Sequence, residues 1–152
     1  MFPLMPVVHL GVQQVEPAVN GIPTLCYDRA RKSLETWRET GAGDSGQPGW
    51  LGGLPIGIKD LNAVAGVKCT YGSPGLADNI PQQSDPLVER LEHRGGLVVG
   101  KTNTPEMGAG GNTFNAVFGM TRNPWDVSLN AGGSSGGATG RACSQRDTYL
   151  VL

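Results

Sequence analysis

The segment LPIGIKDLNAVAG, Leu54–Gly66, joins a short apolar run to a pair of charged residues. Its first half predicts a strand with turns on either side, because isoleucines surround a single glycine. Gly57 inside such a strand lets another stretch of backbone come close. Side chains alternate between the two faces of a strand, so Lys59 and Asp60 point opposite ways and cannot pair with each other.

Helical patterns lie on both sides of this strand. Residues 23–38 predict a helix, because apolar side chains recur at every third or fourth position. This stripe consists of Tyr27, Ala30, Leu34 and Trp37. A second helix is predicted to start at Asp85, a favourable N-cap followed by Pro86, and to end before Gly95. The residues that it should bury are Leu87, Val88 and Leu91.

Three shorter elements complete the pattern. Residues 97–100, LVVG, predict a buried strand, and Pro105 is placed to open a short helix. The last helix is expected to start at or just after Ser134 and Ser135. Because helices and strands alternate along the chain, we expect an α/β layered fold.

The composition limits the classes of protein to which the chain can belong. Its 152 residues fit one domain, and 38% hydrophobic with 16% charged residues is typical of a soluble globular protein. A net charge of −1 predicts neither a nucleic-acid partner nor a membrane partner. The N-terminus lacks the basic start and the cleavage pattern of a signal peptide. The widely spaced Cys26, Cys69 and Cys143 indicate reduced structural thiols and a cytoplasmic protein.

One phosphate-binding pattern in the sequence is coincidental. Residues 95–102, GGLVVGKT, match the phosphate-loop motif G-x4-G-K-T letter for letter. That motif needs a loop between a strand and a helix, whereas here a helical pattern precedes an apolar run suited to a sheet. We therefore expect no nucleotide to bind, and interpret Lys101 as a solvated or hydrogen-bonded residue near the end of a buried strand.

Two stretches could carry chemistry, and each also has a simpler interpretation. Lys59 would be a neutral base if it were buried, because desolvation lowers the pKa of a lysine; otherwise it extends to water. The serines of AGGSSGGATG, Ala131–Gly140, could be a relay or a nucleophile, a helix cap, or part of a linker. A buried lysine combined with a glycine-flanked serine favours an active site.

Taken in order, these motifs resemble the amidase signature family. The resemblance rests on VEPAVNGIPTLCYDRA, GLPIGIKDLNAVAG, GGLVVGKTNTPEMGAGGNTFNAVFGMTRNPWD and AGGSSGGA, and covers about residues 13–138. It implies a mixed β-sheet flanked by helices, present here only in part. It also implies hydrolysis of carbon–nitrogen bonds in small or linear amides, with no cofactor and no metal.

In that family a Ser–Ser–Lys triad performs the reaction. Lys59 matches the lysine. Ser134 matches the middle serine, which relays a proton from the nucleophile and follows a cis peptide bond. Ser135 is interpreted as a structural hydrogen-bonding residue. The substrate-binding candidates lie in the glycine-rich loop before Asn112 and are Gly108, Gly110 and Gly111.

The resemblance ends near the C-terminus. No Gly-Gly-Ser turn of the kind that holds the family's nucleophile follows Ser134, and residues 139–152 depart from the family's alanine-rich helix. We therefore expect the N-terminal part of a single amidase domain, truncated or frame-shifted near residues 139–141, with uncovered sheet edges. Such a chain would dissolve poorly, or would depend on a complementing C-terminal chain or a homo-oligomer.

Three functions stay open on the sequence. The first is an amidase acting on a small-molecule amide, with hydrolysis lost or weak because the nucleophile is missing. The second is an inactive fragment or pseudoenzyme that complements a partner chain. The third is an A-type component of an aminoacyl-tRNA amidotransferase, which shares the triad but works in an RNA complex, for which the sequence contains no basic patch.

Overall fold

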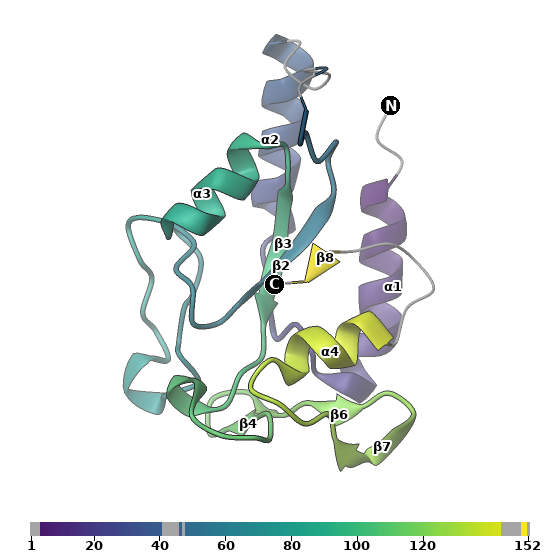
Figure 1. Cartoon of the computed structure of the whole chain (residues 1–152), viewed down its shortest axis with the longest axis vertical. Coiled ribbons are helices and arrows are strands. Elements are labelled where there is room, and N and C mark those ends of the chain that lie inside the picture. Colours follow the sequence, from purple (N-terminus) through teal and green to yellow (C-terminus); the bar gives the residue numbers. More distant parts are fainter. Residues whose placement is uncertain (1–3, 41–45, 47, 144–149, 152) are drawn as a thin grey trace.

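A four-stranded mixed sheet forms the centre of the molecule (Figure 1), in a computed structural model that describes residues 4–40, 46, 48–143 and 150–151. The strand order is β1-β3-β2-β8. These strands are β1 (Thr24–Leu25), β2 (Pro55–Lys59), β3 (Leu97–Thr102) and β8 (Leu150–Val151). β2 runs parallel to β3 and β8, whereas β1 is antiparallel to β3. The expected α/β fold with a mixed sheet is confirmed.

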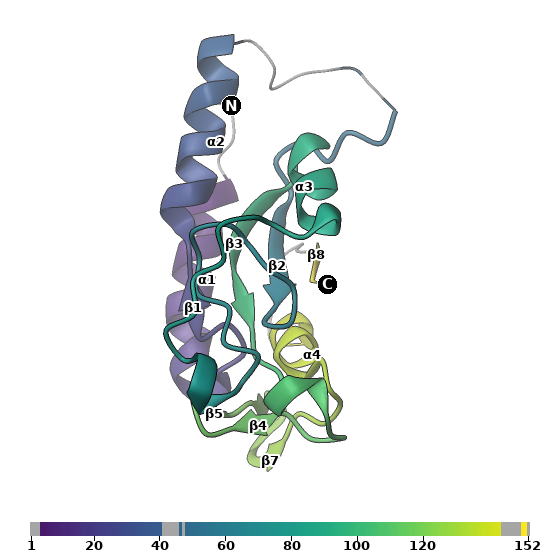
Figure 2. The ribbon, with the colours of Figure 1, turned by 90° about the vertical axis from the view of Figure 1, so that its left-hand side faces the viewer.

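Helices cover both sides of this sheet. They are α1 (Leu4–Val19), α2 (Tyr27–Thr40), α3 (Pro86–His93) and α4 (Gly136–Cys143). Figure 2 shows α1 and α2 together on one side of β2 and β3, with α3 and α4 on the other. The buried apolar residues divide in the same way, with Val12 and Leu34 in one cluster and Ile58 and Val88 in the other. α1 and α2 therefore bury their apolar faces in one cluster, and α3 buries its apolar face in the other.

The first predicted helix has the expected stripe but begins later than expected. Its buried side chains are Tyr27, Ala30 and Leu34, with Trp37 packed partly against them. Residues 24–25 form β1 instead, and the Cys26 N–H donates to the Val99 carbonyl over 2.9 Å. Pairing with the edge of β3 therefore prevails over helix propensity at residues 23–26.

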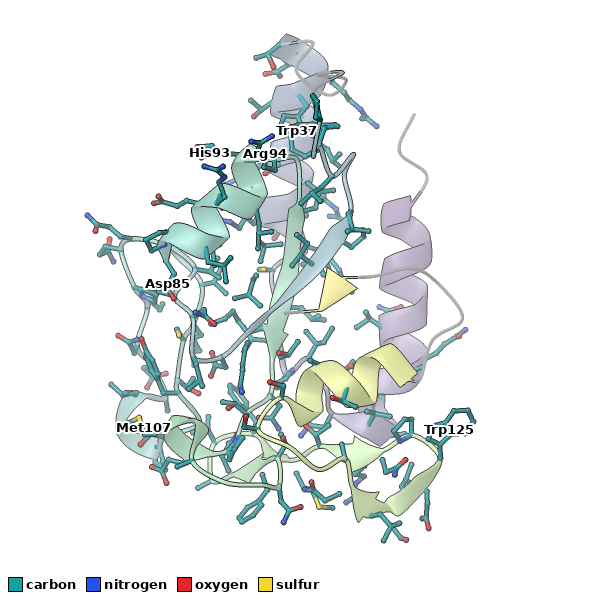
Figure 3. All side chains as sticks on the ribbon, viewed as in Figure 1. Trp37, Asp85, His93, Arg94, Met107 and Trp125 are labelled. Carbon is teal, nitrogen blue, oxygen red and sulfur yellow. The ribbon has the colours of Figure 1, made fainter. Side chains whose placement is uncertain are left out.

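The predicted start of α3 is confirmed, but Asp85 does not cap it with its side chain. The Asp85 backbone is extended, and no side-chain capping hydrogen bond forms. Asp85, labelled in Figure 3 near the start of α3, instead accepts hydrogen bonds at Oδ2 from Asn62 Nδ2 at 2.9 Å and from the Ala63 N–H at 3.1 Å. Asp85 therefore ties the loop after β2 to the start of α3.

The expected burial of α3 is wrong at one position. Val88 is fully buried and Leu91 packs partly against the same cluster, but Leu87 is 51% exposed. Successive helical residues are about 100° apart, so Leu87 and Val88 lie at opposite edges of the apolar stripe, with Leu91 between them. Only the Val88 edge of this stripe faces the buried cluster.

Several elements had no counterpart in the sequence analysis. α1 occupies the apolar N-terminal stretch, and two small hairpins follow β3. The hairpins pair β4 (Phe114–Asn115) with β5 (Gly119–Met120), and β6 (Arg122–Asn123) with β7 (Asp126–Asn130). Two 3-10 turns are η1 (Pro74–Leu76) and η2 (Glu106–Gly108), the second directly after Pro105 as expected. Within the described ranges, no helix has both the length and the apolar character needed to cross a membrane.

Candidate functional site

Lys59 and two serines meet at the C-terminal end of β2. The Lys59 Nζ donates hydrogen bonds to Ser134 Oγ and to Ser135 Oγ, each at 3.0 Å. β2 supplies the lysine, and the residues just before α4 supply the serines, 75 positions after Lys59 in the case of Ser134. The structure thus brings together the two residues that the sequence analysis singled out as catalytic.

The surroundings of Lys59 disfavour its charged form. Partial burial lowers the pKa of the Lys59 ammonium below 10.5, because desolvation penalises the cation. Both hydrogen-bond partners are hydroxyl groups, and no ion pair among the described residues includes Lys59. No carboxylate therefore offsets the desolvation, and a larger fraction of the amine is neutral near pH 8 than for a lysine in water.

Residues 132–135, which we name the serine turn, reverse the chain before α4. Gly132 and Gly133 have φ values of 75° and 67°, a left-handed conformation that side chains rarely adopt. No cis peptide bond occurs in the described ranges, so the cis bond expected before Ser134 is wrong. The two positive φ angles make the turn instead. The conformation of this turn therefore favours glycine at both positions.

The glycine-rich loop lies against the serine turn. The Gly133 N–H donates to the Gly111 carbonyl over 2.7 Å. Gly110 and Gly111 are exposed, whereas Gly108 is half-buried and a Cβ there would lie 2.6 Å from Leu61 Cδ1. Of the three predicted substrate-binding glycines, Gly111 thus borders the turn that carries Ser134. The contact of all three with substrate stays a prediction.

A second lysine forms a buried ion pair close to this site. Lys101 Nζ lies 3.0 Å from Asp60 Oδ1, and both side chains are 0% exposed. Asp60 Oδ2 accepts two further hydrogen bonds, from the Thr70 N–H at 3.0 Å and from Thr70 Oγ1 at 2.6 Å. The interpretation of Lys101 as solvated is therefore wrong, and the hydrogen-bonded alternative is right. Lys59 bonds to the two serines and Asp60 bonds to Lys101, so the two neighbours have different partners, as the strand alternation predicted.

The phosphate-loop pattern has no phosphate-loop structure. β3 occupies residues 97–102 and pairs in parallel with β2. Its backbone groups are thus committed to the sheet rather than to an anion, and Lys101 is committed to Asp60. This arrangement supports the interpretation of the pattern as a buried strand.

The cysteines offer no competing nucleophile in the described part of the chain. Cys26 and Cys69 are free thiols. Burial raises the pKa of Cys26 to about 11 and also raises the pKa of Cys69. Thiolates, the reactive form, are therefore disfavoured at both positions. The Cys143 side chain and residues 144–149 lie outside the described part of the chain.

Polar side chains that were not predicted from the sequence hold the serine turn. Thr104 Oγ1 donates to the Ser134 carbonyl at 3.3 Å, and Thr113 Oγ1 donates to the Gly133 carbonyl at 2.6 Å. Asn130 Oδ1 accepts from the Gly132 N–H at 2.7 Å. A usable signal was the density of Asn and Thr between Asn103 and Asn115, since a buried loop needs polar side chains for its backbone groups.

Comparison with known proteins identifies the family. The amidase family model matches residues 11–140. The chain belongs to the amidase family. Its curated relatives include an acylamidase of Rhodococcus erythropolis, 45% identical over 131 residues that make up 84% of this chain and 27% of the relative. The A-type component of the glutamyl-tRNA(Gln) amidotransferase of Alkaliphilus metalliredigens is 35% identical over 127 residues, 84% of this chain and 26% of that protein.

Solved amidase-family structures share the fold of this amidase chain. A substrate complex of 6-aminohexanoate cyclic dimer hydrolase matches with a TM-score of 0.77 and 28% identity, over 92% of this chain and 29% of that one. A bacterial aryl acylamidase of the amidase signature family gives a TM-score of 0.74 and 32% identity, over 88% and 28%. The chain thus spans less than a third of the length of these relatives and holds a fragment of their fold.

Proposed function

We propose that Lys59 and Ser134 form the proton-relay part of a site that hydrolyses carbon–nitrogen bonds of small or linear amides. The contact that carries this proposal is the 3.0 Å hydrogen bond between Lys59 Nζ and Ser134 Oγ, made by a lysine whose pKa is lowered by burial. Such a distance suits proton transfer between the two groups. The 45% identity to an acylamidase supports an amide as the substrate.

In the proposed mechanism a neutral Lys59 accepts the proton of Ser134, and Ser134 accepts the proton of a nucleophilic serine outside these 152 residues. That serine attacks the amide carbonyl, and backbone N–H groups near it stabilise the oxyanion. The relay then protonates the leaving amine, and water hydrolyses the acyl-enzyme. A neutral amine has one lone pair and two N–H groups, so Lys59 can accept from Ser134 while it donates to Ser135.

The same proposal assigns positions to the remaining candidates. The chain is the N-terminal part of one amidase domain, similar to the family to about residue 138, and its glycine-rich loop borders the substrate. Gly110 and Gly111 suit that role because they are exposed and carry no side chain. The free, high-pKa thiols of Cys26 and Cys69 support a reducing, cytoplasmic setting.

A test is to mix the chain with the C-terminal remainder of the Rhodococcus erythropolis acylamidase and to follow release of p-nitroaniline from an acyl p-nitroanilide. We expect hydrolysis only when both chains are present. Lys59→Met and Ser134→Ala should each reduce the rate by about 10³-fold or more. The matched control is Lys68→Met, which removes an exposed lysine. Equal rates for Lys59→Met and Lys68→Met would refute the proposal.

A second candidate is the A-type component of a tRNA-dependent amidotransferase. Several proteins of this type match the chain, at 35% identity in the example above. The same mixing experiment, performed with the C-terminal part of such a protein and with glutamine as the amide, separates the two functions. Ammonia release from glutamine, with no cleavage of the anilide, would favour the amidotransferase.

A further inference from the structure

A buried threonine hydroxyl joins the two sides of the serine turn. Thr113 is 0% exposed. Its Oγ1 donates to the Gly133 carbonyl at 2.6 Å and accepts from the Gly136 N–H at 2.9 Å. Gly133 and Gly136 stand directly before and directly after Ser134 and Ser135. One hydroxyl group therefore fixes the distance between the two ends of the segment that carries both serines.

The threonine is itself held firmly. Its N–H donates to Asn130 Oδ1 at 3.1 Å, and its carbonyl accepts from Asn130 Nδ2 at 3.0 Å and from the Thr121 N–H at 3.0 Å. Asn130 Oδ1 also accepts from the Gly132 N–H. The clamp thus consists of Thr113 and Asn130, and it contacts two backbone positions of the serine turn and the Gly136 N–H directly after it.

Gly136, at the start of α4, packs closely against Thr113. A Cβ added at Gly136 would collide with Thr113 Oγ1, so the start of α4 approaches the threonine as nearly as a glycine allows. The turn needs such an external support, because Gly132 and Gly133 have the widest backbone freedom of any residue type. Hydrogen bonds from Lys59 reach only the serine side chains.

We propose that Thr113 is a positioning residue that sets the placement of Ser134 and Ser135 relative to Lys59. This inference rests on the proposed function, because proton transfer requires a well-defined distance between Lys59 and Ser134. Thr113 acts through the backbone of the turn, by way of Gly133 and Gly136. A displaced turn would expose Lys59 to water and lengthen the path for its proton.

The test follows the titration of Lys59 in the whole chain by NMR, with lysine labelled with ¹³C at Cε. Lys59→Met removes one resonance and so assigns it. We expect Lys59 to titrate below its ordinary value of 10.5 in the wild type. In Thr113→Val, which keeps the shape but removes both hydrogen bonds, the pKa should shift upwards towards 10.5. Thr113→Ser keeps the hydroxyl and should restore the low value.

The matched control is Thr121→Val. Thr121 is also 0% exposed, and its Oγ1 also makes two hydrogen bonds, to the Asn20 carbonyl at 2.7 Å and from Asn103 Nδ2 at 3.1 Å. Neither partner belongs to the serine turn. We expect Thr121→Val to lower the melting temperature but to leave the pKa of Lys59 low. If a general loss of stability were the cause, the pKa of Lys59 would shift equally in Thr113→Val and Thr121→Val.

The outcomes separate this inference from the proposed function. A wild-type Lys59 that titrates at 10.5 overturns the proposed proton acceptor, whatever Thr113 does. A low wild-type pKa that is unchanged in Thr113→Val, or shifted equally in Thr121→Val, overturns the role of Thr113 alone. If Thr113→Val does not fold, Thr113→Ala removes the same two hydrogen bonds without placing a second methyl group against Gly136. An unshifted Lys59 in a folded Thr113→Ala then overturns the role of Thr113.

Discussion

Two lysines lie near the C-terminal ends of neighbouring parallel strands, and their surroundings differ completely. Lys59 ends β2, and Lys101 is the next-to-last residue of β3, in register with Ile58. Lys101 is fully buried against the carboxylate of Asp60. Lys59 is partly buried, and within the described ranges its ammonium donates to the hydroxyls of Ser134 and Ser135.

The difference shows how one residue type serves two purposes within a single layer. A buried lysine with a carboxylate partner forms an ion pair that is costly to break. A partly buried lysine with only hydroxyl partners is pushed towards the neutral form, in which it can accept a proton. Lys101 therefore belongs to the frame of the sheet, whereas Lys59 is available for chemistry.

The largest expected effect comes from removing the paired lysine. Lys101→Met leaves the Asp60 carboxylate buried and uncompensated, so we expect a loss of about 3–5 kcal/mol in the free energy of unfolding. Urea denaturation followed by circular dichroism measures this loss, and absence of a cooperative transition counts as its extreme form. Lys59→Met, the same substitution one strand away, should stay within about 1 kcal/mol of wild type. Equal losses for the two variants would erase the distinction between the lysines.

A smaller loss is expected at the threonine that supports the ion pair. Thr70→Val removes the 2.6 Å hydrogen bond to Asp60 Oδ2 and leaves the Gly72 N–H without its acceptor. We expect a cost of about 1.5–3 kcal/mol, the usual range for a hydrogen bond to a charged group. Thr70→Ser keeps the hydroxyl and should recover most of the loss in the same urea experiment. A Thr70→Val variant as stable as wild type would mean that Lys101 and the Thr70 N–H satisfy Asp60 without the hydroxyl.

The role of Lys59 was easier to predict from the sequence than the burial of Lys101. Alternation along β2 separated Lys59 from Asp60, and the family resemblance paired Lys59 with Ser134 across a long stretch of chain. The burial of Lys101 was not predictable in the same way. Its partner lies 41 positions earlier, and neither segment by itself specifies the parallel register of β2 and β3. A lysine after an apolar run indicates, on local grounds, only the end of a strand.

The fold divides along the same line. Elements with a local period were predicted, such as the stripe of α2 and the apolar runs of β2 and β3. Elements whose form depends on distant contacts were not. β1 forms because it can pair with the edge of β3. The Asp85 side chain bonds to the loop after β2 instead of capping α3. The second hairpin ends at Asn130, whose side chain holds Thr113. Because this hairpin was not predicted, the supports of the serine turn were not predicted either.

A modest gain in stability is expected at Thr102, the residue in register with Lys59. The Thr102 Oγ1 is buried and makes no hydrogen bond within the described part of the chain. An unpaired buried hydroxyl is unfavourable, so Thr102→Val should raise the free energy of unfolding by about 1 kcal/mol. Thr102→Ser, which keeps the hydroxyl and loses a methyl group, should lower it instead. A destabilised Thr102→Val would show that this hydroxyl has a partner, with Lys59 the nearest candidate in register.

The smallest effect, and the most direct probe of the unpaired lysine, is the pH dependence of stability in Lys59→Met. The pKa of Lys59 is lowered in the folded chain relative to 10.5 in the unfolded chain, because burial penalises the cation. Between these two pKa values the unfolded state binds more protons, so the contribution of Lys59 to stability rises with pH. Below the folded pKa the desolvation penalty is fully present, and it disappears as the pH approaches 10.5. The stability of wild type relative to Lys59→Met should therefore increase from pH 7 towards pH 10.5. Subtracting the two unfolding curves at each pH removes the contributions of Cys26 and Cys69, which are common to both proteins. A difference that is flat or falls with pH would show that Lys59 is as well solvated or as well paired as an ordinary lysine, and the contrast with Lys101 would then be one of burial alone.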